Sequence, residues 1–192
     1  MQTDITVGLN FAASLFILLT FAFAKNIKRL SLLPNILFVW SVFAVSLNIM
    51  LTQSVLRFGF AGKIAEFLGV AATGGSLMVG FIIFIILTTA FAVIALPLYN
   101  VIKKSGAYFK KLESKKAEAD FLASLNNPMR LVYTNILLII ITTVINIIVG
   151  GIEPVAVGSV LCLIIPATVV HISIGMAITG LIEKYPWNIR KK

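Results

Sequence analysis

Charge is scarce in this sequence, and acidic charge most of all. The 192 residues include seven Asp and Glu against sixteen Lys and Arg, and charged residues make up 12% of the chain. Soluble globular proteins carry about 25%. Cysteine and histidine occur once each. A single cysteine excludes an intramolecular disulfide framework and a cysteine-rich metal site. With no catalytic motif in view either, we predict no enzyme, no cofactor and no metal centre.

Apolar residues, at 59% of the chain, dominate the composition. They form five long stretches, at 6–24, 33–55, 68–98, 131–150 and 155–182. Each is long enough for a helix to cross about 30 Å of hydrocarbon. Backbone amides in lipid must be satisfied within the segment, which favours helices. We therefore predict an all-α membrane protein with about five transmembrane helices in a single domain, 1–192.

Positive charge is distributed unevenly over the segments between these stretches. Fourteen of the sixteen cations lie in the first, third and fifth segments: Lys25, Lys28, Arg29, Lys103, Lys104, Lys110, Lys111, Lys115, Lys116, Arg130, Lys184, Arg190, Lys191 and Lys192. The alternate segments hold Arg57 and Lys63. Cationic loops stay cytoplasmic, so we predict an outside N-terminus and a cytoplasmic C-terminus. The cations are expected to contact anionic lipids rather than nucleic acid.

The first apolar stretch is predicted to be a retained span. Ala22-Phe23-Ala24 resembles a signal-peptidase site, but Asp4 precedes the apolar run and the cations follow it. A signal peptide has the opposite polarity.

The connections between spans carry local signals. Residues 57–69 are predicted to form an interfacial turn or amphipathic piece on the outer face. Gly74-Gly75 is expected to separate a shallow lead-in from the third span, which ends at Pro97; a single tilted helix is the alternative. The cytoplasmic connection, 99–130, is predicted to be helical over much of its length. A break at Asn126-Asn127-Pro128 is expected before the fourth span.

Ionisable residues are absent from the middle of every predicted span except for His171. Intramembrane ionisable groups are costly and usually functional. The first interpretation of His171 is a neutral imidazole bonded to a neighbouring helix, the second a proton relay or ligand contact, and the third a metal ligand.

The other intramembrane polar groups are amides and hydroxyls, namely Asn10, Asn48, Gln53, Asn135, Asn146, Ser159, Ser173 and Thr179. Such groups bond across helices, so packing is the first interpretation and a substrate path the second. Small residues four apart, Gly8 with Ala12 and Ser173 with Ala177, predict close helix approach. Pro166 predicts a kink in the last span.

Seven segments of the sequence are distinctive, namely LSLLPNILFVWSVFAVSLNIMLTQSVL (30–56), AGKIAEFLG (61–69), GGSLMVGFIIFIIL (74–87), GLNFAASLFILLTF (8–21), EADFLASLNN (118–127), INIIVGGI (145–152) and IPA (165–167). Together they resemble the FHIPEP family, the membrane proteins of flagellar and virulence-type type III export gates. The motifs keep their order over roughly 6–182. The resemblance implies a multi-pass protein of the bacterial inner membrane that serves protein secretion or flagellum biogenesis.

Departures from the family pattern concern both length and charge. The resemblance implies further spans and a large cytoplasmic ring-forming domain, so we expect a reduced or truncated member; a split gene is an alternative. Positions that are charged in the family are neutral here, namely Ala44, Gln53, Asn126, Tyr133, Asn135 and Ser159, while Arg130 keeps its charge. The family pattern implies that these charges couple a proton gradient to export, so proton coupling is not expected here.

Two functional hypotheses remain open. The first is a reduced or accessory component of a type III export gate that packs with other gate subunits, with full-length relatives or with copies of itself. The second is a stand-alone channel or carrier for ions or small solutes. The candidate functional residues are His171, Asn48, Gln53, Asn126, Arg130, Asn135, Ser159 and Pro166.

Overall fold

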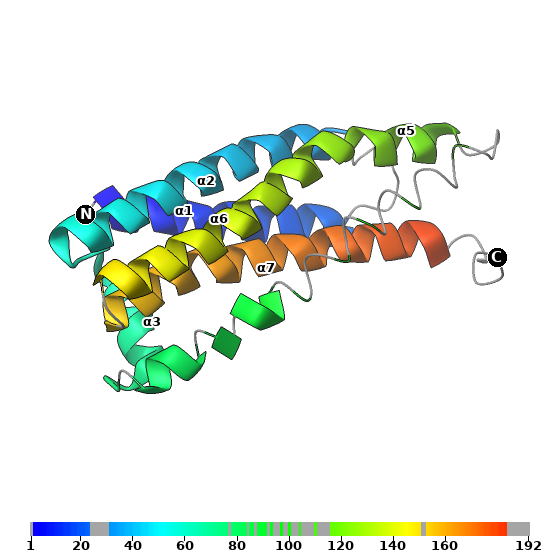
Figure 1. Ribbon diagram of the computed structural model, residues 1–192. Coiled ribbons are helices and arrows are strands. Elements are labelled where there is room, and N and C mark those ends of the chain that lie inside the picture. Colours follow the sequence, from blue (N-terminus) through cyan, green and yellow to red (C-terminus); the bar gives the residue numbers. More distant parts are fainter. Residues whose placement is uncertain are drawn as a thin grey trace.

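The fold is a bundle of long helices, seen here in a computed structural model (Figure 1). The structure describes residues 2–23, 31–76, 78–83, 85–86, 88–91, 116–150 and 153–183, and positions 93, 97, 100, 104 and 110. Within these residues every regular element is a helix. Four helices are long and apolar enough to cross a membrane, or five if a bent pair forms one span. The prediction of an all-α membrane protein is confirmed.

The four long helices correspond to the first, second, fourth and fifth apolar stretches. They are α1 (Gln2–Phe23), α2 (Leu33–Phe58), α6 (Asn126–Gly150) and α7 (Pro154–Glu183). Local sequence sets several of their ends. Pro34 lies in the first turn of α2, where its missing N–H costs nothing. Gly59 ends α2 in the left-handed conformation at φ +60°, and its N–H bonds to the Val55 carbonyl.

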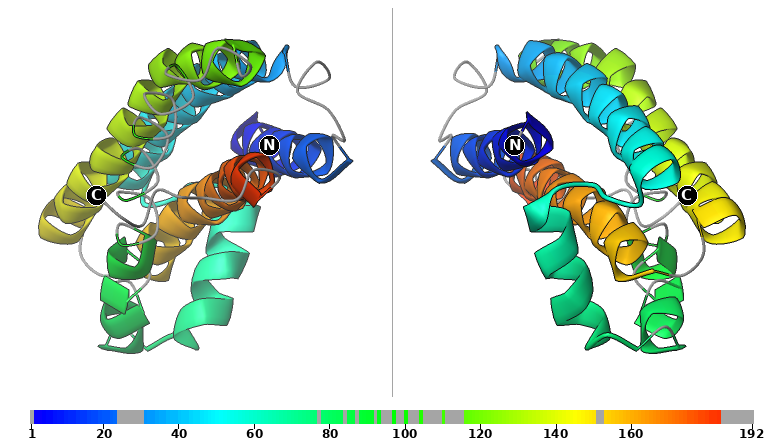
Figure 2. Two further views of the ribbon diagram at one scale, coloured as in Figure 1. Left: turned by 90° about the vertical axis from the view of Figure 1, so that its right-hand side faces the viewer. Right: turned by 90° about the vertical axis from the view of Figure 1, so that its left-hand side faces the viewer.

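Helix α7 occupies the centre of the bundle. It contacts α1, α2, α3 (Lys63–Thr73) and α6, and every residue from Val155 to Ile164 is buried. Helices α2 and α6 lie side by side and run in the same direction, forming one layer beside α7 (Figures 1 and 2). The start of α1 and the end of α7 lie at opposite ends of the bundle (Figure 1).

The third apolar stretch is broken, and the helix at its start extends back to Lys63. Helix α3 begins at Lys63 and ends at Thr73, followed by Gly74 and Gly75 with φ of +55° and +77°. A second helical piece, Met78–Phe91, continues at an angle of 98° to α3. The predicted division at Gly74-Gly75 is therefore present, and the single tilted helix is excluded. Helix α3 is this lead-in, and it includes residues 63–69 of the interfacial piece predicted at 57–69.

The predicted break before the fourth span is present as a turn at Leu125, one residue before the predicted 126–128. Helix α5 (Lys116–Ser124) meets α6 with only Leu125 between them. The Leu125 N–H bonds to the Phe121 carbonyl and the Met129 N–H to the Leu125 carbonyl. Pro128 lies in the first turn of α6, where a proline is tolerated. Residues 119–146 thus form one apolar run that could span a membrane. Most of 99–115 lies outside the described residues.

Candidate functional site

The interior of the bundle is polar at many positions but carries no formal charge in the part of the chain that the structure describes. Its buried polar side chains are Asn10, Ser14, Ser41, Asn48, Thr73, Asn135, Thr142, Thr143, Asn146, Ser159, His171 and Ser173. No Asp, Glu, Lys or Arg described there is buried. No group of three His, Cys, Asp or Glu residues among the described ones could hold a metal ion.

One buried network joins three helices around Pro166. A proline within a helix has no N–H, so the carbonyl four residues earlier, that of Cys162, loses its usual donor. The Asn10 amide of α1 replaces it, with its Nδ2 3.4 Å from the Cys162 oxygen. The Asn10 Oδ1 accepts a bond from the indole Nε1 of Trp40 on α2 at 3.1 Å. Neighbouring helices often satisfy proline-freed carbonyls in this way, and α7 runs through Pro166 without interruption.

A second polar contact joins α2 to α6. The Thr142 hydroxyl lies 2.9 Å from the Asn48 Oδ1 and also bonds to the Leu138 carbonyl of its own helix. Among the described residues, no hydrogen-bond partner is found for the buried Asn48 Nδ2, Asn135 Oδ1 and Asn146 Oδ1. The helices are held by few hydrogen bonds relative to the polar groups that they bury.

His171 lies at a third location, between α7 and the Met78–Phe91 helix. Its Nδ1 is 2.6 Å from the Ala167 carbonyl, one turn earlier in α7. Its ring meets Phe91 edge to face, with centroids 5.5 Å apart. The Nε2 atom is buried without a partner. The histidine bonds to its own helix, and the predicted bond to a neighbouring helix is not seen among the described residues.

The eight candidate residues do not form one site. Asn48, Asn135, Ser159, Pro166 and His171 are buried, whereas Gln53, Asn126 and Arg130 are exposed. The Ser159 hydroxyl bonds to the Ala156 carbonyl of its own helix. The buried members are divided among different helix interfaces, so their arrangement suits helix packing better than a continuous path.

Helices α3 and α7 approach each other closely. A Cβ atom at Gly69 would overlap with the Pro154 carbonyl, and one at Gly158 with the Ala65 carbonyl. Only glycine allows the two backbones to come this close. The approach predicted at Gly8 is wrong, because Gly8 is exposed and nothing lies within 4 Å of a Cβ added there.

The start of α1 fixes the start of α3. The Asp4 Oδ1 accepts a bond from the Ile64 N–H at 2.9 Å. A carboxylate at a helix N-terminus satisfies a free amide and interacts favourably with the helix dipole. Asp4 therefore links the starts of α1 and α3 through a bond between residues that are 60 positions apart in the sequence.

Sequence reasoning missed Trp40, Thr142 and the Gly69–Gly158 crossing. The sequence did contain one signal for the Asn10 network. Pro166 has no N–H, so the carbonyl of Cys162, four residues earlier, can be predicted to need a donor from elsewhere. The identity of that donor depends on how α1 packs, which spacing within one helix does not encode.

The comparisons with known proteins agree with the family resemblance of the first three apolar stretches. The FHIPEP family model matches residues 1–96, half of the chain, and the protein belongs to the FHIPEP family. The downstream motifs of the resemblance lie outside this match and stay a prediction. No solved structure matches the chain.

Three relatives illustrate the likeness. The hypersensitivity response secretion protein HrcV of Ralstonia nicotianae is 38% identical over 96 residues, which are 50% of this chain and 14% of HrcV. The flagellar biosynthesis protein FlhA of Bacillus subtilis is 33% identical over 84 residues, 44% of this chain and 12% of FlhA. Protein MxiA of Shigella flexneri is 32% identical over 85 residues, 44% of this chain and 12% of MxiA. The chain thus covers a small part of each relative.

Proposed function

We propose that the protein is a non-enzymatic membrane component of a type III protein-export gate in the bacterial inner membrane. The observation that carries this proposal is the FHIPEP match over residues 1–96, which contain α1, α2, α3 and the Met78–Phe91 helix. Relatives that match part of this chain are named as a secretion protein and a flagellar biosynthesis protein.

Its role in the gate would be structural. The positions expected to be charged in the family and buried here are Ala44, Asn135 and Ser159. The side chains of alanine, asparagine and serine have no group that takes up or releases a proton near neutral pH, whereas buried amides and hydroxyls can hold helices together. We propose an accessory that packs against full-length relatives, other gate subunits or its own copies through the outer faces of its helices.

The test is site-specific photo-crosslinking in cells. A photoreactive residue is placed at exposed positions, Ile5 on α1, Val42 on α2 and Met176 on α7, and at Leu37 as a matched control that is fully buried. The proposal predicts crosslinks to export-gate subunits, or to the chain itself together with those subunits, at one or more exposed positions and none at Leu37. Crosslinks only to unrelated membrane proteins would contradict it.

A second candidate function, a carrier or channel for small solutes, rests on one observation. The buried His171 Nε2 has no partner in the part of the chain that the structure describes, and it could bond to a passing solute. Solute uptake into proteoliposomes that disappears in His171→Ala would support this function. The separation of the buried polar groups among several interfaces favours the structural role instead.

A further inference from the structure

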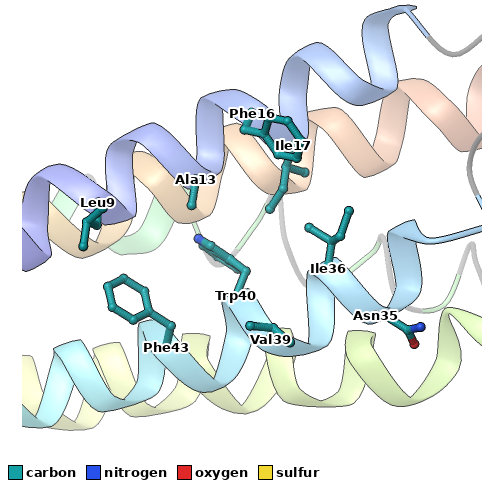
Figure 3. A pocket seen from close by; sticks show the side chains of 9 residues that line it. All are labelled: Leu9, Ala13, Phe16, Ile17, Asn35, Ile36, Val39, Trp40 and Phe43. Carbon is teal, nitrogen blue, oxygen red and sulfur yellow. The ribbon is translucent and has the colours of Figure 1, made fainter.

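Two regions of the described bundle differ in what they offer to a small molecule. The groove between α1 and α2 has a volume of about 500 Å³ and is lined mainly by apolar side chains, including Phe16 and Val39 (Figure 3). Asn35 points away from the space between the helices (Figure 3), and the indole N–H of Trp40 is bonded to Asn10. No free polar group among the described residues that line this groove identifies an occupant. The interface around His171, in contrast, contains two buried polar atoms that lack a partner in the described part of the chain.

The Met78–Phe91 helix packs against α7 along one of its sides. Two contacts fix this arrangement: a Cβ added at Gly80 would lie 3.4 Å from the Val157 Cγ2 atom, and the Phe91 ring meets the His171 ring edge to face. The two helices therefore run side by side in the same direction. The residues of this helix that are described as buried or half-buried recur along the side that faces α7, namely Gly80, Ile83, Thr88 and Phe91.

Thr88 lies at the depth of the His171 imidazole. Side chains of an α-helix point back toward its N-terminus, and the His171 ring does so, since its Nδ1 lies 2.6 Å from the Ala167 carbonyl oxygen. The ring thus covers the turn from Ala167 to His171, which rises about 6 Å. Thr88 precedes Phe91 by three residues, or about 4.5 Å of helix. The Thr88 hydroxyl and the imidazole therefore face one interface at the same level.

The two groups are complementary in hydrogen bonding. A carbonyl oxygen can only accept, so the Nδ1 atom that bonds to Ala167 carries the ring proton. In the neutral imidazole Nε2 is then an acceptor, whereas the Thr88 hydroxyl can donate. Among the described residues, no partner is found for the buried His171 Nε2 or for the buried Thr88 Oγ1. Bound water commonly pairs such buried polar groups.

The α7 side of this interface is small at the level of Thr88. Ala167 lies one turn before His171 on the same face of α7 and has only a methyl side chain. The small side chain leaves space between the helices beside the imidazole. A water molecule there would have two polar partners, which is within the range found for buried waters.

We propose that the interface between α7 and the Met78–Phe91 helix contains a binding site for one water molecule, held between Thr88 and His171. The water accepts a hydrogen bond from the Thr88 hydroxyl and donates one to the His171 Nε2. It links the second helix of the broken third stretch to the central helix of the bundle. It also engages the lone pair that a passing solute would need, whether or not the protein serves an export gate.

The histidine itself supplies the measurement. The chain has one histidine, so isotopic labelling of histidine nitrogen reports on this ring alone. Solid-state NMR of the full chain in lipid bilayers is expected to show a proton on Nδ1 and none on Nε2, with the Nε2 resonance at the position of a hydrogen-bonded acceptor. Magnetisation from water protons should reach Nε2. A proton on Nε2 would overturn the proposal.

Two adjacent threonines provide matched variants. Thr88→Val removes the buried hydroxyl with little change in shape, whereas Thr89→Val makes the same change at an exposed position. The proposal predicts that Thr88→Val shifts the Nε2 resonance to the position of a free acceptor and abolishes the transfer from water, and that Thr89→Val leaves both unchanged. Thr88→Ser keeps the hydroxyl and should retain both.

Two results would contradict the site. One is an Nε2 resonance at the same position in the wild type and in Thr88→Val. The other is a hydrogen-bonded Nε2 in the wild type that receives no magnetisation from water, and this readout needs no variant that might fail to fold.

Discussion

At the scale of the residue, Asn10 shows how an uncharged side chain stabilises a fold in lipid. The proline at position 166 removes a donor from α7, and the Cys162 carbonyl is then satisfied by Asn10 of another helix. The same amide accepts from Trp40, so one side chain links α1, α2 and α7. Hydrogen bonds between transmembrane helices contribute about 0.6 to 2 kcal/mol each.

Asn10→Ala is expected to lower the free energy of unfolding in detergent by about 1 to 3 kcal/mol, because two buried groups lose their partner. Asn35→Ala, which removes an exposed amide from α2, is expected to change it by less than about 0.5 kcal/mol.

A double-mutant cycle isolates the bond to the carbonyl. Pro166→Ala restores an N–H that can bond to the Cys162 carbonyl within α7, so Asn10→Ala should cost about half as much in that background. An equal cost in both backgrounds would mean that the Asn10–Cys162 bond contributes nothing.

At the scale of the element, two close backbone approaches define how α3 and α7 cross. Gly69 and Gly158 each lie against a carbonyl of the opposite helix. Gly69→Ala and Gly158→Ala are therefore expected to destabilise the bundle by about 1 to 3 kcal/mol, as overpacking does. Thermal unfolding of the purified variants measures this.

Gly8 provides the matched control, because a Cβ there meets nothing within 4 Å. Gly8→Ala should be neutral or should stabilise α1 by up to about 1 kcal/mol, since alanine is the better helix former. Equal losses at Gly8 and Gly158 would contradict the crossing described here.

How far the elements could be predicted depends on whether their signal is local. The long apolar runs predict α1, α2, α6 and α7 because the membrane imposes a length that one segment can meet alone. The turn at Gly74-Gly75 is local too. Pro128 predicts the break at Leu125 only to within a few residues, because proline breaks a helix interior but begins a helix without cost. The Gly69–Gly158 crossing and the Asn10 network depend on which helices become neighbours, and hydropathy does not specify neighbours.

At the scale of the whole molecule, we predict that the N-terminus lies outside and the C-terminus in the cytoplasm. Three crossings separate Gln2 from Lys116 if the Met78–Phe91 helix belongs to a span. In a Cys162→Ala background, Gln2→Cys should react with an impermeant maleimide on intact spheroplasts, and Lys116→Cys, at an exposed position, only after lysis. Leu37→Cys, at a fully buried position, is the unreactive control. Labelling of both exposed sites from one side would exclude an odd number of crossings.

We propose that the membrane interior of this protein holds helices together and moves no charge. In the described part of the chain, the buried polar groups are neutral amides and hydroxyls together with the single imidazole of His171. These groups are distributed over separate interfaces, where a proton has no continuous series of titratable sites to follow.

The most direct test is proton flux into proteoliposomes that contain the purified protein and a pH-sensitive dye, driven by a potassium diffusion potential. We predict a rate equal to that of protein-free vesicles, for the wild type and for His171→Ala alike. A potential-driven acidification in the wild type that is lost in His171→Ala would show that the protein conducts protons through His171 and would contradict this proposal.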